Sequence, residues 1–364
     1  MLRLALEHVK PGMVTSRNIY GANGSLLLAR DHILDRLVIE RLANMDIDAV
    51  YVKNPFSGSE AARDILYEST RIEAVRLVQK TFEGFRRVRI LELHDMREVV
   101  GKIVDDILNN RDVLLNLTDI RTRNDYTFGH SVNVCLISAL IGVKMQLEGQ
   151  QLTELATGAI LHDVGMMSVP PALLNKKDKL TPEEWEVTKG HTGFGFDILR
   201  MQAAVSLPAA YVAYQHHENF DGTGYPKGIR GETIHQYARI AAIADIYDSM
   251  TSERAYRPAR QPHEVYAVMQ GSRGTMLDPR VVDLFLASVV LFPEGTMVQL
   301  DGGEIGVVVR VEPKLQARPT VRVVGHEKGL RVIRGRIIDL TREGKRSIVK
   351  VYKPEEVVAM KLSD

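Results

Sequence analysis

Apolar and polar positions change their spacing along the chain, and the first change lies near residue 55. Residues 34–45 carry apolar side chains at helical spacing, and residues 49–52 are a short apolar run typical of a strand. Residues 21–24 (Gly-Ala-Asn-Gly) separate two short apolar runs, as a hairpin turn does. The pattern predicts a small α/β unit over residues 1–55.

Residues 56–117 are charged and amphipathic, with apolar side chains mostly at steps of three to four residues. The segment is predicted to be a helical connector. Two interpretations stay open: a helix that packs on the next domain, or a connecting helix through which two copies of the chain dimerise.

Residues 118–292 have a helical pattern throughout. Residues 181–184 (Thr-Pro-Glu-Glu) are a capping box with proline at the first helical position, which predicts a helix leading to His191. From residue 293 onward, β-branched runs bounded by turn residues predict a small β-rich, barrel-like domain over residues 293–364. Whether that domain is a structural appendage or a regulatory module stays open. The predicted fold is a multi-domain α+β protein with an all-α centre.

Composition narrows the class of protein. A length of 364 residues predicts about two to three domains, and a formal net charge of +1 gives no electrostatic reason to expect a DNA or RNA partner. The one cysteine, Cys135, lies in an apolar run and is expected to be a buried hydrophobic residue in a reducing compartment. The chain has neither an apolar run of membrane-spanning length nor a signal peptide at its start, so we expect a cytoplasmic protein.

The chemistry is concentrated in three places. His216 and His217 are adjacent and precede a loop with glycines at 222, 224 and 228, while His162-Asp163 and Asp245 lie in or near apolar helical segments. Imidazoles placed in apolar surroundings are costly unless they are paired or bind a metal. One such histidine is most simply a core residue, but the whole set favours a shared metal site.

These residues also resemble a known family. The pairs His162-Asp163 and Gly224-Tyr225-Pro226, together with the ordered blocks 125–131, 191–195 and 244–258, are similar to HD-GYP domains. These domains are a branch of the HD phosphohydrolases that hydrolyses the bacterial second messenger cyclic di-GMP. The similarity spans about half of the chain.

The resemblance implies a dinuclear metal centre in which Asp163 bridges the two ions. It implies that His130, His162 and Asp245 hold one ion and that His191, His216 and His217 hold the other. Some relatives carry a glutamate that supports a third metal, and Tyr126 stands at that position here, so we expect two ions. Imidazole and carboxylate ligands without thiolate suit iron or manganese, and the resemblance puts iron first.

The resemblance also implies substrate contacts. Arg254 and Arg257 match phosphate-binding positions, and their spacing puts both on one face if the segment is helical. Solvated surface charges are the open alternative. Tyr225 is expected to stack on a guanine or to line the pocket, next to Gly224. His162, Asp163 and Asp248 are the expected catalytic residues.

One position departs from the family pattern. Met166 stands where most HD-GYP sequences have a lysine near the metals, and the loss of one such charge typically lowers a rate by about 10²–10³. Three functions therefore remain in view. The first is hydrolysis of cyclic di-GMP to linear pGpG, with GMP as a further product. The second is a cyclic di-GMP sensor with weak or no turnover, and the third is an enzyme acting on another nucleotide. The expected partners are cyclic di-GMP and a second copy of the chain.

Overall fold

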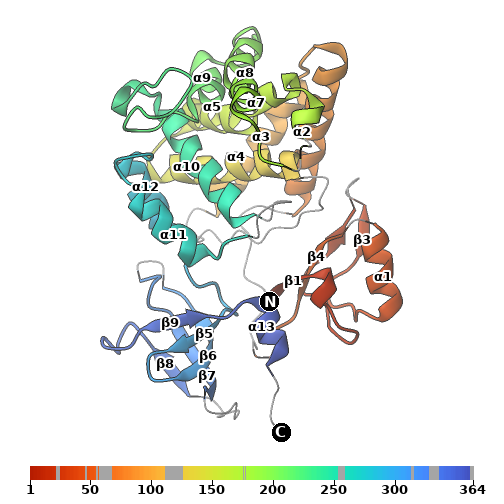
Figure 1. Ribbon diagram of the computed structural model, residues 1–364, viewed down its shortest axis with the longest axis vertical. Coiled ribbons are helices and arrows are strands. Elements are labelled where there is room, and N and C mark those ends of the chain that lie inside the picture. Colours follow the sequence, from red (N-terminus) through yellow and green to blue (C-terminus); the bar gives the residue numbers. More distant parts are fainter. Residues whose placement is uncertain are drawn as a thin grey trace. The chain divides into compact units, whose positions relative to one another are not determined.

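The computed structural model divides into two compact units (Figure 1). The first holds the described residues up to 56 and from 288 onward, and the second holds the described residues between 68 and 287 except Tyr126. The described residues are 1–21, 25–45, 47–54, 56, 68–110, 126–174, 176, 178–252, 259–312, 315–327 and 336–360.

The N-terminal part of the first unit has two antiparallel strand pairs and one helix. Strand β1 pairs with β4, and β2 pairs with β3. The helix starts where the Asp35 carboxylate accepts a hydrogen bond from the Val38 N–H, which satisfies one of its free N-terminal donors. The elements are β1 (Leu2–Ala5), η1 (Leu6–His8), β2 (Ile19–Tyr20), β3 (Leu26–Leu28), α1 (Arg36–Asn44) and β4 (Ala49–Val52). The predicted helix and strand are confirmed. Paired strands flank the predicted turn, whose residues 22–24 lie outside the described residues.

The C-terminal part of the same unit is a five-stranded antiparallel sheet with the order β8-β7-β6-β5-β9. Its elements are β5 (Met297–Leu300), β6 (Glu304–Arg310), β7 (Thr320–His326), β8 (Ile337–Asp339), β9 (Ile348–Val351) and α13 (Pro354–Ala359). The predicted β-rich domain is therefore confirmed. Among the described strands none pairs β8 with β9, so the sheet is open and the predicted barrel is not confirmed.

The two chain ends share one apolar core. Buried side chains from the N-terminal part, including Leu4 and Val50, cluster with Met297 and Val307 from the C-terminal sheet. Polar contacts reinforce this packing, because the Asn54 side chain donates to the Gly295 carbonyl (2.8 Å). This packing joins segments about 250 residues apart in the sequence. The four sequence-based segments, residues 1–55, 56–117, 118–292 and 293–364, stay a prediction.

The regular elements described in the second unit are all helical. In the segment predicted as a helical connector, the helices α2 and α3 pack on each other, and α3 packs on α5. The elements are α2 (Glu68–Val88), α3 (His94–Asn109), α4 (Tyr126–Lys144), α5 (Gly149–Ile160), η3 (Val164–Ser168), α6 (Pro171–Leu174), α7 (Pro182–Lys189), α8 (His191–Arg200), α9 (Leu207–Gln215), η4 (Gly231–Thr233), α10 (Gln236–Thr251), α11 (Pro262–Gly271) and α12 (Pro279–Leu286).

Helix α9 organises the middle of this unit because it packs against α5, α8 and α10. Its contact with α5 is close at Gly158, where a Cβ atom would lie 2.6 Å from the Ala209 carbonyl oxygen. The predicted capping box is present: Thr181 and Glu184 exchange side-chain and backbone hydrogen bonds at the start of α7. None of the helices in the described part of the chain is long and apolar enough to span a membrane.

Candidate metal centre

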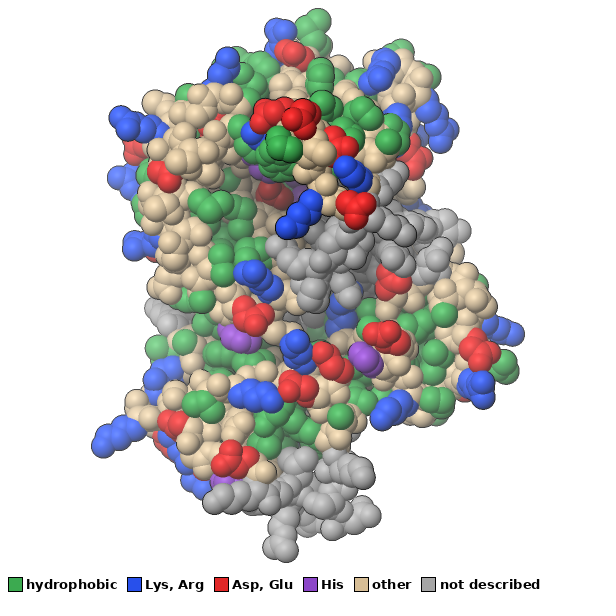
Figure 2. Space-filling view, in the orientation of Figure 1, with side chains coloured by type: hydrophobic (Ala, Val, Ile, Leu, Met, Phe, Trp, Pro, Cys, Tyr) green, Lys and Arg blue, Asp and Glu red, His purple; other side chains and the backbone are tan. Residues whose placement is uncertain are grey.

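The seven predicted ligands come together in the second unit. His130 lies on α4, His191 begins α8 and Asp245 lies on α10. The other four follow helix ends: His162-Asp163 come directly after α5, and His216-His217 come directly after α9. Figure 2 shows histidine and acidic side chains inside a hollow in the upper part of the molecule. Segments far apart in the sequence thus deliver imidazoles and carboxylates to one place.

The first cluster consists of His130, His162 and Asp245, whose candidate ligand atoms all lie within 4.8 Å of one another. His130 Nε2 lies 3.1 Å from Asp245 Oδ1. Its other ring nitrogen, Nδ1, lies 2.7 Å from Asp248 Oδ2. Asp248 is buried and also accepts a hydrogen bond from the Asn133 side chain (2.8 Å). This cluster is therefore rich in carboxylate.

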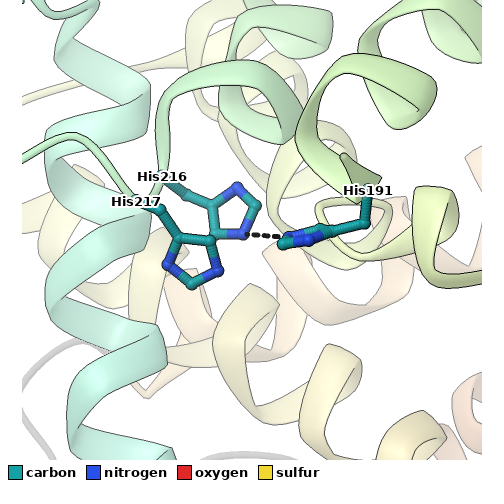
Figure 3. A group of neighbouring side chains, drawn as sticks. All are labelled: His191, His216 and His217. Carbon is teal, nitrogen blue, oxygen red and sulfur yellow. Dashed lines mark hydrogen bonds between the residues drawn. The ribbon is translucent and has the colours of Figure 1, made fainter. Parts of the chain in front are cut away.

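The second cluster consists of His191, His216 and His217, again with ligand atoms within 4.8 Å of one another (Figure 3). His191 and His216 approach through their Nε2 atoms, which are 3.5 Å apart. The His216 and His217 rings have centroids 4.1 Å apart. This cluster consists of imidazoles alone.

Asp163 lies between the two clusters. One of its oxygens, Oδ2, is 3.4 Å from His162 Nε2. The other, Oδ1, is 3.5 Å from His191 Nε2 and 3.8 Å from His216 Nε2. A carboxylate that turns one oxygen to each cluster has the arrangement needed to bridge two cations.

Backbone carbonyls determine which ring nitrogens are available. The Nδ1 atoms of His162, His191 and His216 lie 2.7–3.1 Å from carbonyl oxygens of residues 159, 188, 212 and 213. A carbonyl oxygen only accepts, so each Nδ1 carries a proton and Nε2 is the ring nitrogen that is left to bind a metal. Fixing a ligand tautomer through the second ring nitrogen is the usual arrangement at protein metal sites.

The charges of the cluster suit a cation. Burial lowers the pKa of His217 to about 4 although Asp245 acts in the opposite direction, so this imidazole is neutral near pH 7. Burial and the neighbouring His217 likewise lower the pKa of His216 well below its usual range. Burial opposes ionisation of Asp163, but the surrounding imidazoles outweigh it and hold its pKa well below the usual range. Neutral imidazoles and ionised carboxylates are the protonation states that bind divalent metals.

His130 differs from the other imidazoles. Burial disfavours its charged form, but the hydrogen bonds to Asp245 and Asp248 prevail and raise its pKa to about 10. A metal that takes His130 Nε2 must therefore displace a proton from this site.

Unsatisfied atoms show that the residues fit a metal. His162 Nε2 is buried and has no hydrogen-bond partner. His191 Nε2 and His216 Nε2 lie 3.5 Å apart, close enough for one cation to contact both. Buried polar atoms without a partner are costly, and a divalent cation coordinated by these atoms removes that cost. The donor set therefore fits divalent metal ions.

Two motif glycines allow the close packing around the site. A Cβ atom at Gly165, in η3, would lie 1.9 Å from the His191 carbonyl oxygen, so only glycine lets this turn approach the start of α8. A Cβ atom at Gly224 would lie 2.4 Å from the His217 carbonyl oxygen. The expected role of Gly224 in substrate binding stays a prediction, and its observed contact is with backbone.

The loop after His217 folds back over that residue. The Tyr225 N–H donates to the His217 carbonyl (3.1 Å), and the two rings have centroids 4.8 Å apart. The buried Glu218 carboxylate accepts from the Lys227 N–H (2.7 Å) and holds the far side of the loop. Tyr225 thus covers one ligand of the imidazole cluster, at a position suited to lining a pocket.

Other predicted residues are less directly placed. Asp248 contacts His130 and Asn133, which favours a positioning role, and its catalytic role stays a prediction. Met166 lies in η3, half-buried, where its N–H donates to the Asp163 carbonyl (2.9 Å). Arg254 and Arg257 lie outside the described residues.

Sequence reasoning missed the support for Asp248. Asn133 lies three residues after His130, so both point from one face of α4 toward Asp248. Arg71 of α2 donates to the Asn133 side chain (2.8 Å). The helical spacing of His130 and Asn133 was a usable signal for Asn133, whereas nothing in the sequence links Arg71 to this site.

Comparison with known proteins gives two family matches. A family model described as an HD domain matches residues 102–281, and one described as a KOW domain associated with the HD domain matches residues 297–359. The second match agrees with the observed C-terminal sheet.

Similar proteins come from several bacteria. A Pseudomonas aeruginosa protein named cyclic di-GMP phosphodiesterase is 31% identical over 306 residues, which is 82% of this chain and 74% of that protein. A Thermotoga maritima protein of the same name is 30% identical, over 62% of this chain and 65% of its own. A Vibrio cholerae protein named 3′3′-cGAMP-specific phosphodiesterase 3 is 33% identical, over 48% of this chain and 38% of its own.

The fold is shared with a solved structure. A Bdellovibrio bacteriovorus protein described as an HDG"Y"P protein superposes with a TM-score of 0.51 at 18% identity, covering 78% of this chain and 98% of that one.

Proposed function

The chain belongs to the HD domain family, in its HD-GYP branch, and we propose that it is a metal-dependent phosphodiesterase that hydrolyses cyclic di-GMP to linear pGpG. One structural observation carries the hydrolytic part: the Nε2 atoms of His162, His191 and His216 all lie within 3.8 Å of the Asp163 carboxylate. The substrate rests on the names of the two cyclic di-GMP phosphodiesterases that this chain resembles.

We propose that the centre takes two ions. His130, His162 and Asp245 hold the first, His191, His216 and His217 hold the second, and Asp163 bridges them. When bound, such a pair supplies an activated water and positive charge for the phosphoryl oxygens. The imidazole and carboxylate donors suit iron or manganese, and we propose iron first.

The reaction consumes one water molecule. A bond forms between the water oxygen and one phosphorus, and the bond from that phosphorus to the ribose 3′ oxygen breaks. The leaving oxygen takes up a proton and the second phosphodiester stays intact, which gives linear pGpG. We propose further cleavage of pGpG to GMP as a secondary reaction.

The chain's own residues prepare the site for this reaction. Asp248 and Asn133 hold the His130 ring, while backbone carbonyls fix the tautomers of three other ligands. Tyr225 and the loop around it limit access beside His217. We propose that Arg254 and Arg257 bind the phosphate that is not cleaved.

A second candidate function rests on Met166. Its side chain carries no ammonium group, although it lies three residues after the bridging carboxylate, in the turn that follows Asp163. A centre without that charge can bind metals and cyclic di-GMP yet turn over slowly, which suits a sensor. Met166→Lys tests this idea: in a sensor weakened only at this position, kcat rises more than affinity because the charge acts on the transition state.

The decisive assay uses protein purified without oxygen and loaded with ferrous iron or manganese. Cyclic di-GMP is added and the products are separated by chromatography. The proposal predicts pGpG. Intact cyclic di-GMP together with tight binding would favour the sensor. Preferred cleavage of a mixed cyclic dinucleotide would identify that dinucleotide as the substrate instead of cyclic di-GMP. We also propose a homodimer through the segment 56–117, whose described part contains α2 and α3, and light scattering tests the dimer.

A further inference from the structure

Helix α7 presents the chain's one tryptophan to solvent. Trp185 is 45% exposed, and no residue of α7 is buried. Packing therefore does not explain a large aromatic side chain at this position. A tryptophan on an exposed helix leaves apolar area in water, where a ligand can reach it.

A chain of ring contacts links Trp185 to the metal centre. The His217 and Tyr225 rings lie 4.8 Å apart at an interplanar angle of 33°. The Tyr225 ring meets the edge of Trp185, with centroids 6.2 Å apart and an angle of 77°. Trp185 is thus two ring contacts away from a candidate metal ligand, on the side where Tyr225 covers His217.

A cation lies over the same two rings. Lys189 Nζ is 5.5 Å from the Tyr225 centroid and 6.0 Å from the Trp185 centroid. Its ammonium also pairs with Glu186 (2.6 Å), and its side chain is 27% exposed. Two aromatic rings and a positive charge at the edge of a phosphodiester site form a surface suited to a nucleobase, because bases stack on aromatic faces and guanine offers acceptor atoms to lysine.

The geometry holds this surface in place. The capping box fixes the first turn of α7, and Lys176 forms an ion pair with Glu184 (2.5 Å) on the same helix. Gly190 alone separates the end of α7 from His191, a candidate ligand. A base resting on Trp185 is therefore held at a defined distance from the phosphate site.

We propose that Trp185 stacks on one guanine of the cyclic dinucleotide while the metal centre holds a phosphate, and that Lys189 contacts the edge of the same base. This inference rests on the proposed function and adds a specificity-determining residue to it. Stacking of one base on an aromatic side chain corresponds to roughly a 5- to 150-fold gain in affinity.

The test uses tryptophan fluorescence, because all tryptophan emission comes from Trp185. The metal-loaded full chain is titrated with a hydrolysis-resistant phosphorothioate analogue of cyclic di-GMP, and calorimetry follows the same titration. We expect emission to be quenched with the midpoint that calorimetry gives. Trp185→Leu should weaken binding of the analogue by roughly 5- to 150-fold at unchanged metal content, and Trp185→Phe should weaken it less.

Phe194 provides a matched control. It is 50% exposed on α8 and makes no ring contact with another described aromatic side chain, so Phe194→Leu should leave affinity unchanged. Calorimetric binding without any change in emission, or wild-type affinity in Trp185→Leu, overturns the inference but leaves the phosphodiesterase proposal standing. If Trp185→Leu fails to fold, the affinity of Trp185→Phe and the emission of the wild-type protein still test whether Trp185 stacks on the base. Absence of both calorimetric binding and hydrolysis overturns the inference and the proposed function together.

Discussion

The two halves of the candidate metal centre are built from different groups. In the half with His130, His162 and Asp245, carboxylates provide charge and hydrogen bonds, and Asp248 holds a ring nitrogen. In the half with His191, His216 and His217, backbone carbonyls hold the His191 and His216 rings, and His217 Nδ1 lies 4.0 Å from Asp245 Oδ2. Asp163 lies within 3.8 Å of imidazoles from both halves. The comparison indicates that the imidazole half depends mainly on Asp163 for charge, whereas the other half has charge of its own.

The strongest test removes the shared anion. Asp163→Ala leaves the two ions with uncompensated repulsion and removes the main charge of the imidazole half, so we expect that half to lose its ion, total bound metal to fall and hydrolysis to drop below detection. Elemental analysis and product chromatography measure the two effects. Asp105→Ala, at an exposed carboxylate on α3, is the control and should keep both. Wild-type metal content and turnover in Asp163→Ala would mean that the bridge is assigned to the wrong residue.

The next test separates the halves. His217 is the most exposed of the imidazole trio (29% of its side chain), and its ring is absent from the carboxylate half. His217→Ala should release the ion of the imidazole half and leave about one ion per chain, with turnover strongly reduced because both charges act on the phosphoryl group. Loss of both ions would show that the halves bind metal cooperatively, which the comparison does not predict.

A milder change probes the support of the carboxylate half. In Asp248→Asn the amide keeps the size of the side chain, but one of its two accepting positions becomes a donor that faces His130 or Asn133. Changes in groups that orient a ligand typically weaken metal affinity by about 10–100-fold. We expect activity to need correspondingly more added manganese and to recover at saturation. No recovery at any metal concentration would assign Asp248 to the chemistry itself.

The smallest predicted effects concern stability at the boundary of the imidazole half. Gly165→Ala places a Cβ against the His191 carbonyl oxygen and should lower the free energy of unfolding by about 1–3 kcal/mol. Gly193→Ala lies on α8 with no atom within 4 Å of its added Cβ, so it should stabilise the protein by about 0.4–1 kcal/mol. Denaturant unfolding of both variants checks the pair, and equal effects would remove the argument for close packing at Gly165.

The candidate metal ligands were predictable because each lies near the end of an apolar helical segment or within one, and in a recognisable motif. The apolar periodicity also predicted α1 and β4, and the capping box predicted α7. Contacts between distant segments were not predictable in this way. The shared core of the chain ends, the Arg71 to Asn133 hydrogen bond and the approach of Trp185 to Tyr225 depend on tertiary packing, which leaves no mark in local spacing.

Some features of the structure have no local signal in the sequence. The carbonyls that fix the histidine tautomers are backbone atoms, which every residue type carries, so the sequence does not indicate them. The open order of the C-terminal sheet likewise depends on strand pairing, which β-branched runs indicate only as strands. The roles of Arg254 and Arg257 stay predictions.

The most direct test of the account measures metal content and hydrolysis on one sample of wild-type protein purified without oxygen. The account predicts about two ions of iron or manganese per chain and conversion of cyclic di-GMP to pGpG, with both lost after chelation. A reproducible content near zero or three ions would contradict the two-part centre. Intact cyclic di-GMP after incubation with the two-ion protein would contradict its proposed function.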